Sequence, residues 1–177
     1  MTAAPRTTRT LHGFTIVELL IVIVVIGILA AISIIAYTNV QNRGHDSAIQ
    51  NDLRTIAKQF ELYKIDNQRY PAGDAELGTL RLRVARSSYG NGIISNTYNL
   101  LYCRVSADGP DKFALIAGSK SGNVFTYRSE ASAITSASTW TDMSNSMPNC
   151  QAAGINQTIG TDRDFFYLSS SWRPYTN

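Results

Sequence analysis

A single carboxylate, that of Glu18, lies within the apolar stretch LHGFTIVELLIVIVVIGILAAISIIAY, residues 11–37. A charged side chain deep in a bilayer is costly, so an acidic residue in such a stretch is a functional hypothesis that needs a named partner. The partial positive charge at a helix N-terminus stabilises a carboxylate in the first turn. Glu18 is therefore the first candidate for a functional charge in this chain.

The two cysteines, Cys103 and Cys150, lie in the polar part of the chain, well after the apolar stretch. If that part is exported, oxidising conditions favour a disulfide, and two thiols allow only one intramolecular bridge. Closing the long loop between them would stabilise the fold by about 4 kcal/mol, because the bridge lowers the entropy of the unfolded chain. The alternative is a pair of unconnected buried thiols.

The sequence contains no residue pattern typical of a catalytic centre or a metal site. His45 follows the apolar stretch on a predicted helix, a setting unsuited to the cleft that a Ser-His-Asp or Cys-His arrangement needs. There is no Walker loop, no GxGxxG motif and no Cys/His spacing typical of a metal site. The acidic pairs Asp108 with Asp111 and Asp162 with Asp164 lack a full calcium-ligand pattern, so we interpret them as turn residues. We therefore expect no enzyme activity and no cofactor.

The composition allows one modest soluble domain besides the apolar stretch. The chain has 177 residues, 44% of them hydrophobic and 16% charged, with a formal net charge of +3. Two of the basic residues, Arg6 and Arg9, precede the apolar stretch, so the rest of the chain is close to neutral. This balance does not by itself indicate a nucleic-acid partner.

The uncharged run from Leu19 to Tyr37 is long enough to cross a membrane. As a helix with a rise of 1.5 Å per residue it spans roughly 30 Å, which matches a hydrocarbon core. Arg6, Arg9 and His12 precede the run, and no basic residue follows before residue 43. The positive-inside rule therefore predicts a cytoplasmic N-terminus, with the residues beyond about 40 outside.

Three interpretations of the N-terminus are open at this point. A cleaved signal peptide has a shorter apolar region, although Ala30 and Ala31 are small enough for a cleavage site. An uncleaved signal anchor fits the length and the flanking charges but gives no reason for Glu18. The third interpretation accounts for the order of residues from Gly13 to Glu18, and it rests on a resemblance.

The segment GFTIVELLIVIVVIGILAAI closely resembles the N-terminal segment of type IV pilins and of the pseudopilins of type II secretion systems. In that family a short basic leader ends in Gly, a prepilin peptidase cuts before Phe on the cytosolic side, and the new N-terminal Phe is methylated. The resemblance implies that residues 1–13 are the leader, that cleavage falls between Gly13 and Phe14, and that Phe14 is methylated. Beyond this segment the chain resembles the family only in layout.

The same resemblance implies a role for Glu18 in assembly. Cleavage creates an ammonium at Phe14, and Glu18 of an incoming subunit can pair with the Phe14 ammonium of a neighbour in the filament. Such pairing offsets the desolvation of both ions. The implied partners are copies of the chain, the prepilin peptidase, an assembly platform protein with its ATPase, and membrane lipid before assembly. Many members carry a proline where this chain has Ile35, so no proline kink is expected there, and Gly44 is the nearer candidate for flexibility.

After Tyr37 the apolar residues recur at steps of three and four, which is typical of one stripe on a helix. The stripe consists of Ile49, Leu53, Ile56, Ala57, Phe60 and Tyr63. The segment DNQRYPAG predicts that the helix ends near Asn67. A helix from Phe14 to Asn67 would have an all-round apolar first half, stable only in lipid or against copies of itself, and a striped second half able to cover a sheet.

Three segments have the composition of strands, residues 97–105, 112–119 and 123–129, with turns predicted at residues 108–111 and 120–122. Residues 164–169 are a predicted fourth strand. Residues 130–160, rich in Ser, Thr, Ala and Asn, are expected to be irregular. The resemblance implies that Cys103 and Cys150 tie this irregular segment to the sheet.

These elements predict an α+β fold, the pilin fold. A long N-terminal helix, membrane-embedded in its first half, packs by its second half on a small antiparallel sheet. The predicted domains are a leader at 1–13, a transmembrane and polymerisation helix at 14–37, an amphipathic continuation at 38–68 and a globular head at 69–177.

The predicted function is that of a structural subunit of a type IV pilus, held in the bacterial inner or cytoplasmic membrane before assembly and extracellular afterwards. The alternatives are a pseudopilin of a type II secretion or DNA-uptake system and a membrane-anchored extracellular binding domain. Arg81, Arg83 and Arg86 form a short basic run that allows a nucleic-acid contact, although such runs are more often solvated surface.

Overall fold

The computed structural model describes residues 13–90, 99–105, 111–137, 146–155 and 164–167. The chain forms two compact units, residues 1–40 and residues 41–177. The helices of the described parts are α1 (Ile16–Asn67), α2 (Gly73–Thr79), the short 3-10 helix η1 (Arg86–Ser88) and α3 (Ser146–Ala152). The strands are β1 (Leu100–Val105), β2 (Lys112–Gly118), β3 (Val124–Arg128), β4 (Ala133–Ala137) and β5 (Asp164–Tyr167).

The helix α1 ends where the sequence predicts, at Asn67. The next residue, Gln68, has a left-handed φ of 61°, and its N–H donates to the carbonyl oxygen of Lys64 at 2.7 Å. This contact is a common way to satisfy the last free carbonyls of a helix. α1 is helical through both Ile35 and Gly44. The flexibility suggested for Gly44 stays a prediction.

The five strands form one antiparallel sheet in the order β4-β3-β2-β1-β5. The three central predicted strands are confirmed, and the fourth is present as β5, which pairs with β1 rather than with its neighbours along the sequence. In the register, Cys103 lies opposite Ala114 of β2 and Phe165 of β5.

The prediction that residues 130–160 are irregular is wrong in two places. The strand β4 occupies Ala133–Ala137 and pairs with β3, and the helix α3 occupies Ser146–Ala152. Tertiary contacts override weak local preferences here. β4 pairs with the edge of β3 that β2 does not occupy. The half-buried Ile134 lies opposite Tyr127 and packs against the core that contains Tyr127.

One face of the sheet carries the larger core, which is formed with the second half of α1. Phe60 of α1 lies 4.7 Å from the ring centroid of Tyr102 and 5.3 Å from that of Phe113, both in edge-on geometry that aromatic pairs favour. The residues of α1 in this core are Ile49, Leu53, Ile56, Ala57 and Phe60, all exposed by 2% or less. The apolar stripe predicted from the sequence is therefore the face that packs on the sheet.

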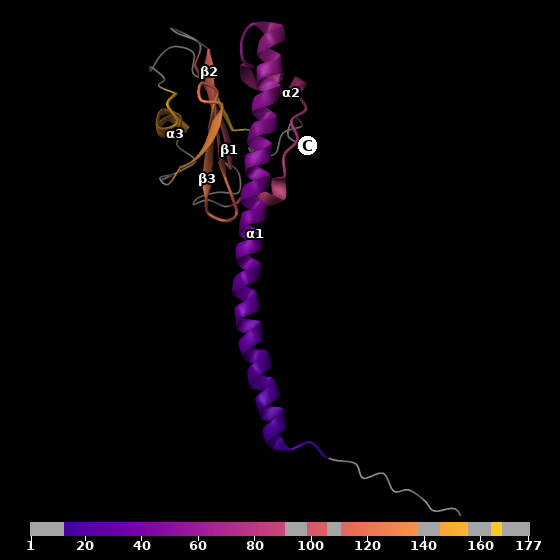
Figure 1. Ribbon diagram of the computed structural model, residues 1–177. Helices are drawn as coiled ribbons and strands as arrows, with labels where there is room; N and C mark the ends of the chain where they lie inside the picture. The colour runs from indigo at the N-terminus through magenta and orange to yellow at the C-terminus, as the bar shows by residue number, and fades with distance from the viewer. Residues whose placement is uncertain (1–12, 91–98, 106–110, 138–145, 156–163, 168–177) are drawn as a thin grey trace, which may run out of the picture. The chain divides into compact units, whose positions relative to one another are not determined.

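The opposite face of the sheet carries a smaller core beneath α3. It consists of Leu101, Cys103, Ala114, Ile116, Cys150, Ala153 and Ile155. Figure 1 shows α3 and the second half of α1 on opposite sides of the strands. Arg128 of β3 donates to the carbonyl oxygen of Ala152 at 3.3 Å, which places a cation at the C-terminal end of α3.

Gly90 allows the segment that follows η1 to pack on the turn between β2 and β3. A Cβ at this position would lie 2.3 Å from the Cα of Lys120, so any other residue would clash with backbone. The N–H of Gly90 donates to the carbonyl oxygen of Gly118, and the N–H of Lys120 donates to that of Ser88. Glycine is required here by the close approach of two backbones.

Candidate functional site

The N-terminal end of α1 is organised by two side chains, Thr15 and Glu18. The Thr15 Oγ1 accepts a hydrogen bond from the Glu18 N–H at 3.2 Å. In return, the Glu18 carboxylate accepts from the Thr15 N–H at 2.9 Å and from the Thr15 hydroxyl at 2.7 Å. These reciprocal contacts form a capping box, which satisfies N–H groups that the first turn of a helix leaves free.

The capping box supplies a partner for Glu18 that the sequence-based prediction missed. An ammonium was the expected partner, yet the partner within the chain is Thr15, three residues earlier. The signal was present in the sequence, because TIVE has the Thr-x-x-Glu spacing of a capping box. The Glu18 carboxylate is therefore hydrogen-bonded inside its own chain, which lowers the cost of carrying it beside an apolar run.

Gly13 and Phe14 lie outside the helix, immediately before the capping box. Phe14 is 80% exposed. The three residues from Gly13 to Thr15 have no helical or strand structure, so the Gly13–Phe14 peptide bond belongs to a non-helical segment that leads directly into α1.

The first half of α1 presents apolar side chains on all of its faces. Every Val, Leu and Ile from Ile16 to Val40 is exposed by 48% or more. By length and composition, α1 can cross a membrane. The hydroxyls of Ser33 and Thr38 donate to the carbonyl oxygens of Leu29 and Ile35. Both polar side chains are thereby satisfied by the helix itself.

The disulfide joins Cys103 of β1 to Cys150 of α3, with the two Cα atoms 5.7 Å apart. Both residues are fully buried in the smaller core. The bridge therefore fastens α3 to the face of the sheet that α1 does not cover.

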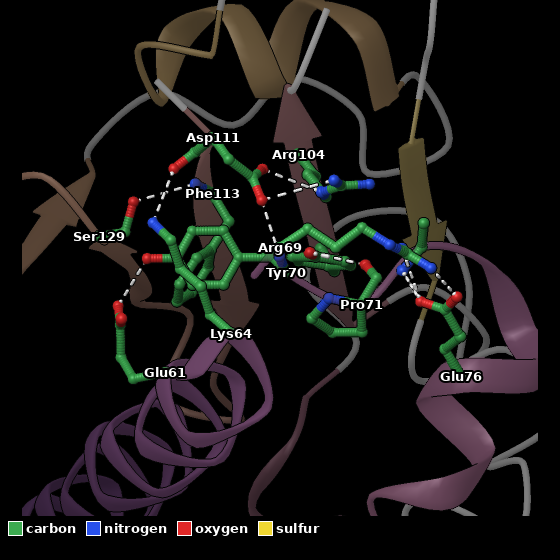
Figure 2. A network of polar contacts seen from close by, with 12 residues as sticks. Glu61, Lys64, Arg69, Tyr70, Pro71, Glu76, Arg104, Asp111, Phe113 and Ser129 are labelled. Carbon is green, nitrogen blue, oxygen red and sulfur yellow. Dashed lines mark hydrogen bonds and ion pairs between the residues drawn. The ribbon is translucent and has the colours of Figure 1, made fainter. Parts of the chain in front are cut away.

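A polar network joins the C-terminal end of α1 to the sheet (Figure 2). At its centre, the Asp111 carboxylate accepts from the Nε of Arg104 at 3.0 Å and from the N–H of Tyr70 at 2.7 Å. The Arg104 and Asp111 side chains are only 5% and 15% exposed. The Tyr70 hydroxyl donates to Glu61 at 2.8 Å, and the Nζ of Lys64 lies 4.2 Å from the Tyr70 ring centroid. The Nζ of Lys64 also donates to the carbonyl oxygen of Asp111 at 3.3 Å. Asp111, predicted as a turn residue, thus contacts α1, the loop that follows it and β1.

A second ion pair, between Arg69 and Glu76, closes the loop between α1 and α2 (Figure 2). Glu76 also accepts from the N–H of Ala72 at 2.7 Å. The hydrogen bonds from Arg69 lower the pKa of Glu76 to about 2, although partial burial opposes this shift. Both side chains thus fasten the loop, which is a structural role.

Asp52 is a buried carboxylate on the face of α1 that packs on the head. It accepts from the N–H of Ala85 at 2.6 Å and from the Tyr89 hydroxyl at 3.1 Å. Burial raises the pKa of Asp52, and the two hydrogen bonds oppose that shift. Asp52 therefore ties the segment before η1 to α1.

The remaining sequence candidates belong to the second unit, residues 41–177. The His45 Nδ1 lies 3.3 Å from the Ser88 Oγ. Arg81 and Arg83 are exposed and Arg86 is half-buried, so the nucleic-acid contact stays a prediction. Within the described ranges, no group of three or more His, Cys, Asp or Glu side chains could hold a metal ion. Residues 108 and 162 of the acidic pairs lie outside those ranges.

Comparisons with known proteins give a match at the N-terminal end of the chain. Residues 9–34 match the family model of the prokaryotic N-terminal methylation motif. The type IV wide pilus major component PilA4 of Thermus thermophilus is 34% identical over 117 residues, which cover 66% of this chain and 80% of that protein. The type II secretion system core protein G of Dickeya chrysanthemi is 32% identical over 72 residues, 41% of this chain and 47% of that protein.

The protein G of Pseudomonas aeruginosa gives a similar match, 32% identity over 72 residues that cover 41% of this chain and 51% of that protein. The chain thus covers about half the length of these two secretion proteins. No solved structure matches the chain. The chain belongs to the family of type IV pilins and type II secretion pseudopilins. The relatives are named as pilus and secretion-system components, which is consistent with the expectation of no enzyme activity.

Proposed function

We propose that the chain is a structural subunit of a type IV pilus that polymerises through the first half of α1. The observation that carries this proposal is the exposure of every large apolar side chain from Ile16 to Val40. An all-round apolar helix is stable in lipid or against other apolar helices, and not in water. A chain that needs lipid first and copies of itself later is a membrane-stored filament subunit.

Processing between Gly13 and Phe14 is the first step of this proposal. Phe14 is 80% exposed, and Gly13, Phe14 and Thr15 are not helical, which suits cleavage of the bond by a peptidase. Residues 1–13 are the leader, and cleavage makes Phe14 the new N-terminus and the site of methylation. The match to the methylation motif over residues 9–34 supports this assignment.

Assembly is the second step, and it uses Glu18. In the single chain, Thr15 supplies the hydrogen bonds to the Glu18 carboxylate. In the filament, the Phe14 ammonium of a neighbouring subunit becomes available as a stronger, charged partner. When Glu18 exchanges Thr15 for this ammonium, the helix cap is lost, at a cost of about 1 kcal/mol. This cost is much less than that of leaving a charge unpaired in an apolar environment. Thr15 thus keeps Glu18 satisfied until a neighbour's N-terminus arrives.

The proposed location follows from the charges around the first half of α1. Arg6, Arg9 and His12 precede the apolar run, which favours an N-terminus on the cytoplasmic side of the bacterial inner or cytoplasmic membrane. The head is then outside and becomes part of an extracellular pilus. The proposed partners are copies of the chain, a prepilin peptidase, and a platform protein with an assembly ATPase.

Mass spectrometry of the N-terminus, after expression with and without a prepilin peptidase, tests the processing step. We expect a chain that begins with methylated Phe14 when the peptidase is present and an uncut leader when it is absent. An intact Met1 in both cells, or cleavage near Ala31, would contradict the pilin assignment. The first of these results would favour a membrane-anchored binding domain.

The assembly step is tested with Glu18→Gln, which keeps the size of the side chain and removes its charge. We expect normal cleavage and a large loss of filaments in electron micrographs. Asp66→Asn is the matched control, because it removes the charge of an exposed carboxylate without changing its size, at the end of α1 and outside the polymerising half. Normal filament numbers for Glu18→Gln would contradict the proposed role of the charge.

The second candidate function is that of a pseudopilin of a secretion system. It is favoured by the matches to the protein G of two bacteria. Long surface filaments in electron micrographs support the pilus, whereas short fibres that stay within the cell envelope support the pseudopilin.

A further inference from the structure

Arg43 is the first charged residue on α1 after Glu18, because the residues between them, Leu19 to Asn42, carry no charge. Arg43 follows Tyr37, the end of the apolar run, by six residues, which is about 9 Å along a helix. The headgroup region of a bilayer is roughly 5–8 Å deep on each side, and an arginine side chain can extend back toward it along its own helix. When the run spans a membrane, the Arg43 guanidinium therefore reaches the outer headgroups.

The next ionisable residues on α1 contact the head, and Arg43 differs from them. The Nδ1 of His45 lies 3.3 Å from the Oγ of Ser88. The Asp46 carboxylate accepts a hydrogen bond from the Nδ2 of Asn123 at 2.8 Å. Both of these α1 side chains are half-buried, whereas Arg43 is exposed. Of the three ionisable groups that follow the apolar run, Arg43 is the one that the described part of the head leaves exposed.

The described residues supply no acidic partner for Arg43. Charged side chains three or four residues apart on a helix can pair, and Asp46 is the acidic residue at such a spacing from Arg43. Its carboxylate instead accepts hydrogen bonds from Ser121 and Asn123. Residues 91–98, the nearest segment along the sequence outside the described ranges, contain no Asp or Glu. The position of Arg43 on the helix therefore points to an anion from outside the chain.

The residues around Arg43 are typical of a membrane interface. Tyr37 is 65% exposed, and tyrosines are enriched where hydrocarbon meets water. Asn39, Gln41 and Asn42 are exposed neutral amides, which can form hydrogen bonds in a headgroup layer. The planar guanidinium of arginine donates paired hydrogen bonds to phosphate oxygens. Phosphate is the anion that phospholipids hold at this level.

We propose that Arg43 binds the phosphate of a phospholipid in the outer leaflet while the subunit is stored in the membrane. This inference rests on the proposed function in one respect, that the first half of α1 spans the membrane. The position selects the occupant, because a guanidinium held within the headgroup layer is surrounded by lipid phosphates. The contact holds the stored subunit at one depth and breaks when the subunit leaves the membrane for a filament.

Solid-state NMR of the full chain in phosphatidylglycerol vesicles tests this contact. Arginines are labelled with 13C at the guanidinium carbon, and dephasing of their signal by lipid 31P reports phosphorus close to that carbon. Arg43→Lys keeps the charge and removes one labelled carbon. We expect it to remove about a third of the dephased signal, because Arg6, Arg9 and Arg43 are the arginines that flank the span.

Arg54→Lys is the matched control for this measurement. It removes one labelled carbon from an exposed position further along α1, so the dephased signal should keep its wild-type size. Equal dephased signals for wild type and Arg43→Lys would overturn the proposal, and so would an equal loss for both variants.

Two further measurements separate lipid phosphate from other partners of Arg43. In vesicles of a phosphate-free glycolipid with inorganic phosphate in the buffer, wild type and Arg43→Lys should give the same dephasing. A difference as large as in phosphatidylglycerol would assign the contact to free phosphate and overturn the lipid contact. The urea midpoint of the head in detergent should be the same for wild type and Arg43→Gln, and a lower midpoint for the variant would place the partner of Arg43 within the folded chain.

None of these measurements requires filaments, so they also separate this inference from the pilus proposal. A wild-type chain that forms no filaments but shows the Arg43 contact would contradict the pilus and support the lipid contact. Filaments from a chain without that contact would do the reverse.

Discussion

The two halves of α1 have the same backbone conformation and opposite surroundings. From Ile16 to Val40 every large apolar side chain is exposed, whereas in the second half Ile49, Leu53 and Phe60 are fully buried against the sheet. A helix satisfies its own backbone in water and in lipid alike, so the side chains decide which environment each half requires. Stability of the head and assembly of the filament therefore depend on different stretches of one helix. Substitutions in the two halves should have separable effects.

The largest expected effect comes from truncating Phe60 in the second half. Phe60→Ala should lower the free energy of unfolding of the head by about 3–5 kcal/mol, because it removes a buried ring and leaves a cavity. Ile26→Ala, at an exposed position of the first half, should leave that free energy unchanged. Urea unfolding of the full chain in detergent, followed by near-UV circular dichroism, measures both. Equal effects of the two substitutions would contradict the inference that stability of the head depends on the second half of α1 and not on the first.

The next effect concerns the face of the sheet that α1 does not cover. Replacing both Cys103 and Cys150 by Ala should cost about 2–4 kcal/mol, because the bridge no longer restricts the unfolded chain. The core beneath α3 is small, whereas the core formed with α1 does not include the bridge. Hydrogen exchange should therefore show early opening of α3 while β2 and the second half of α1 stay protected. Simultaneous loss of protection on both faces would contradict this order.

A smaller effect is expected at the start of the first half. Thr15→Ala removes the cap of α1 and the partner of Glu18, which should cost the first turn about 1 kcal/mol. We expect fewer filaments per cell, while the urea midpoint of the head stays at its wild-type value. Thr15→Ser keeps the hydroxyl and should restore the filaments. A shift of the urea midpoint would place the effect of Thr15 in the head instead.

The smallest effect is a pH dependence in the loop that follows the second half. Arg69 lowers the pKa of Glu76 from 4.5 to about 2, so the folded chain binds this proton less tightly than the unfolded chain. The contact stabilises the head fully above pH 4.5 and loses this contribution as the pH falls toward about 2. Because the Arg69 side chain is 44% exposed, solvent screening keeps the effect below about 1 kcal/mol.

Urea midpoints of wild type and Glu76→Gln between pH 2 and 7 measure this dependence. The difference between the two chains should shrink at low pH, and a difference that does not change with pH would contradict the role of the carboxylate.

Much of α1 and of the candidate site could be predicted from residues close together in the sequence. The apolar run, the stripe of Ile49, Leu53 and Phe60, and the stop at Asn67 are periodic or local signals, and a helix forms its hydrogen bonds between residues four apart. The order Gly13, Phe14, Glu18 is equally local. The capping box is local as well, because Thr15 and Glu18 are three residues apart.

The tertiary structure alone decided which distant segments meet. β5 pairs with β1, and the segment between these two strands is more than half of the head's sequence. β4 forms by pairing with the edge of β3. Asp111 accepts hydrogen bonds from Arg104 and Tyr70, and Asp52 accepts one from Ala85. No spacing in the sequence predicts these contacts, because tertiary packing brings the residues together. The physical reason is that strand pairing and buried polar contacts depend on which surfaces the core brings together, whereas local preferences for a strand are worth only about 1 kcal/mol.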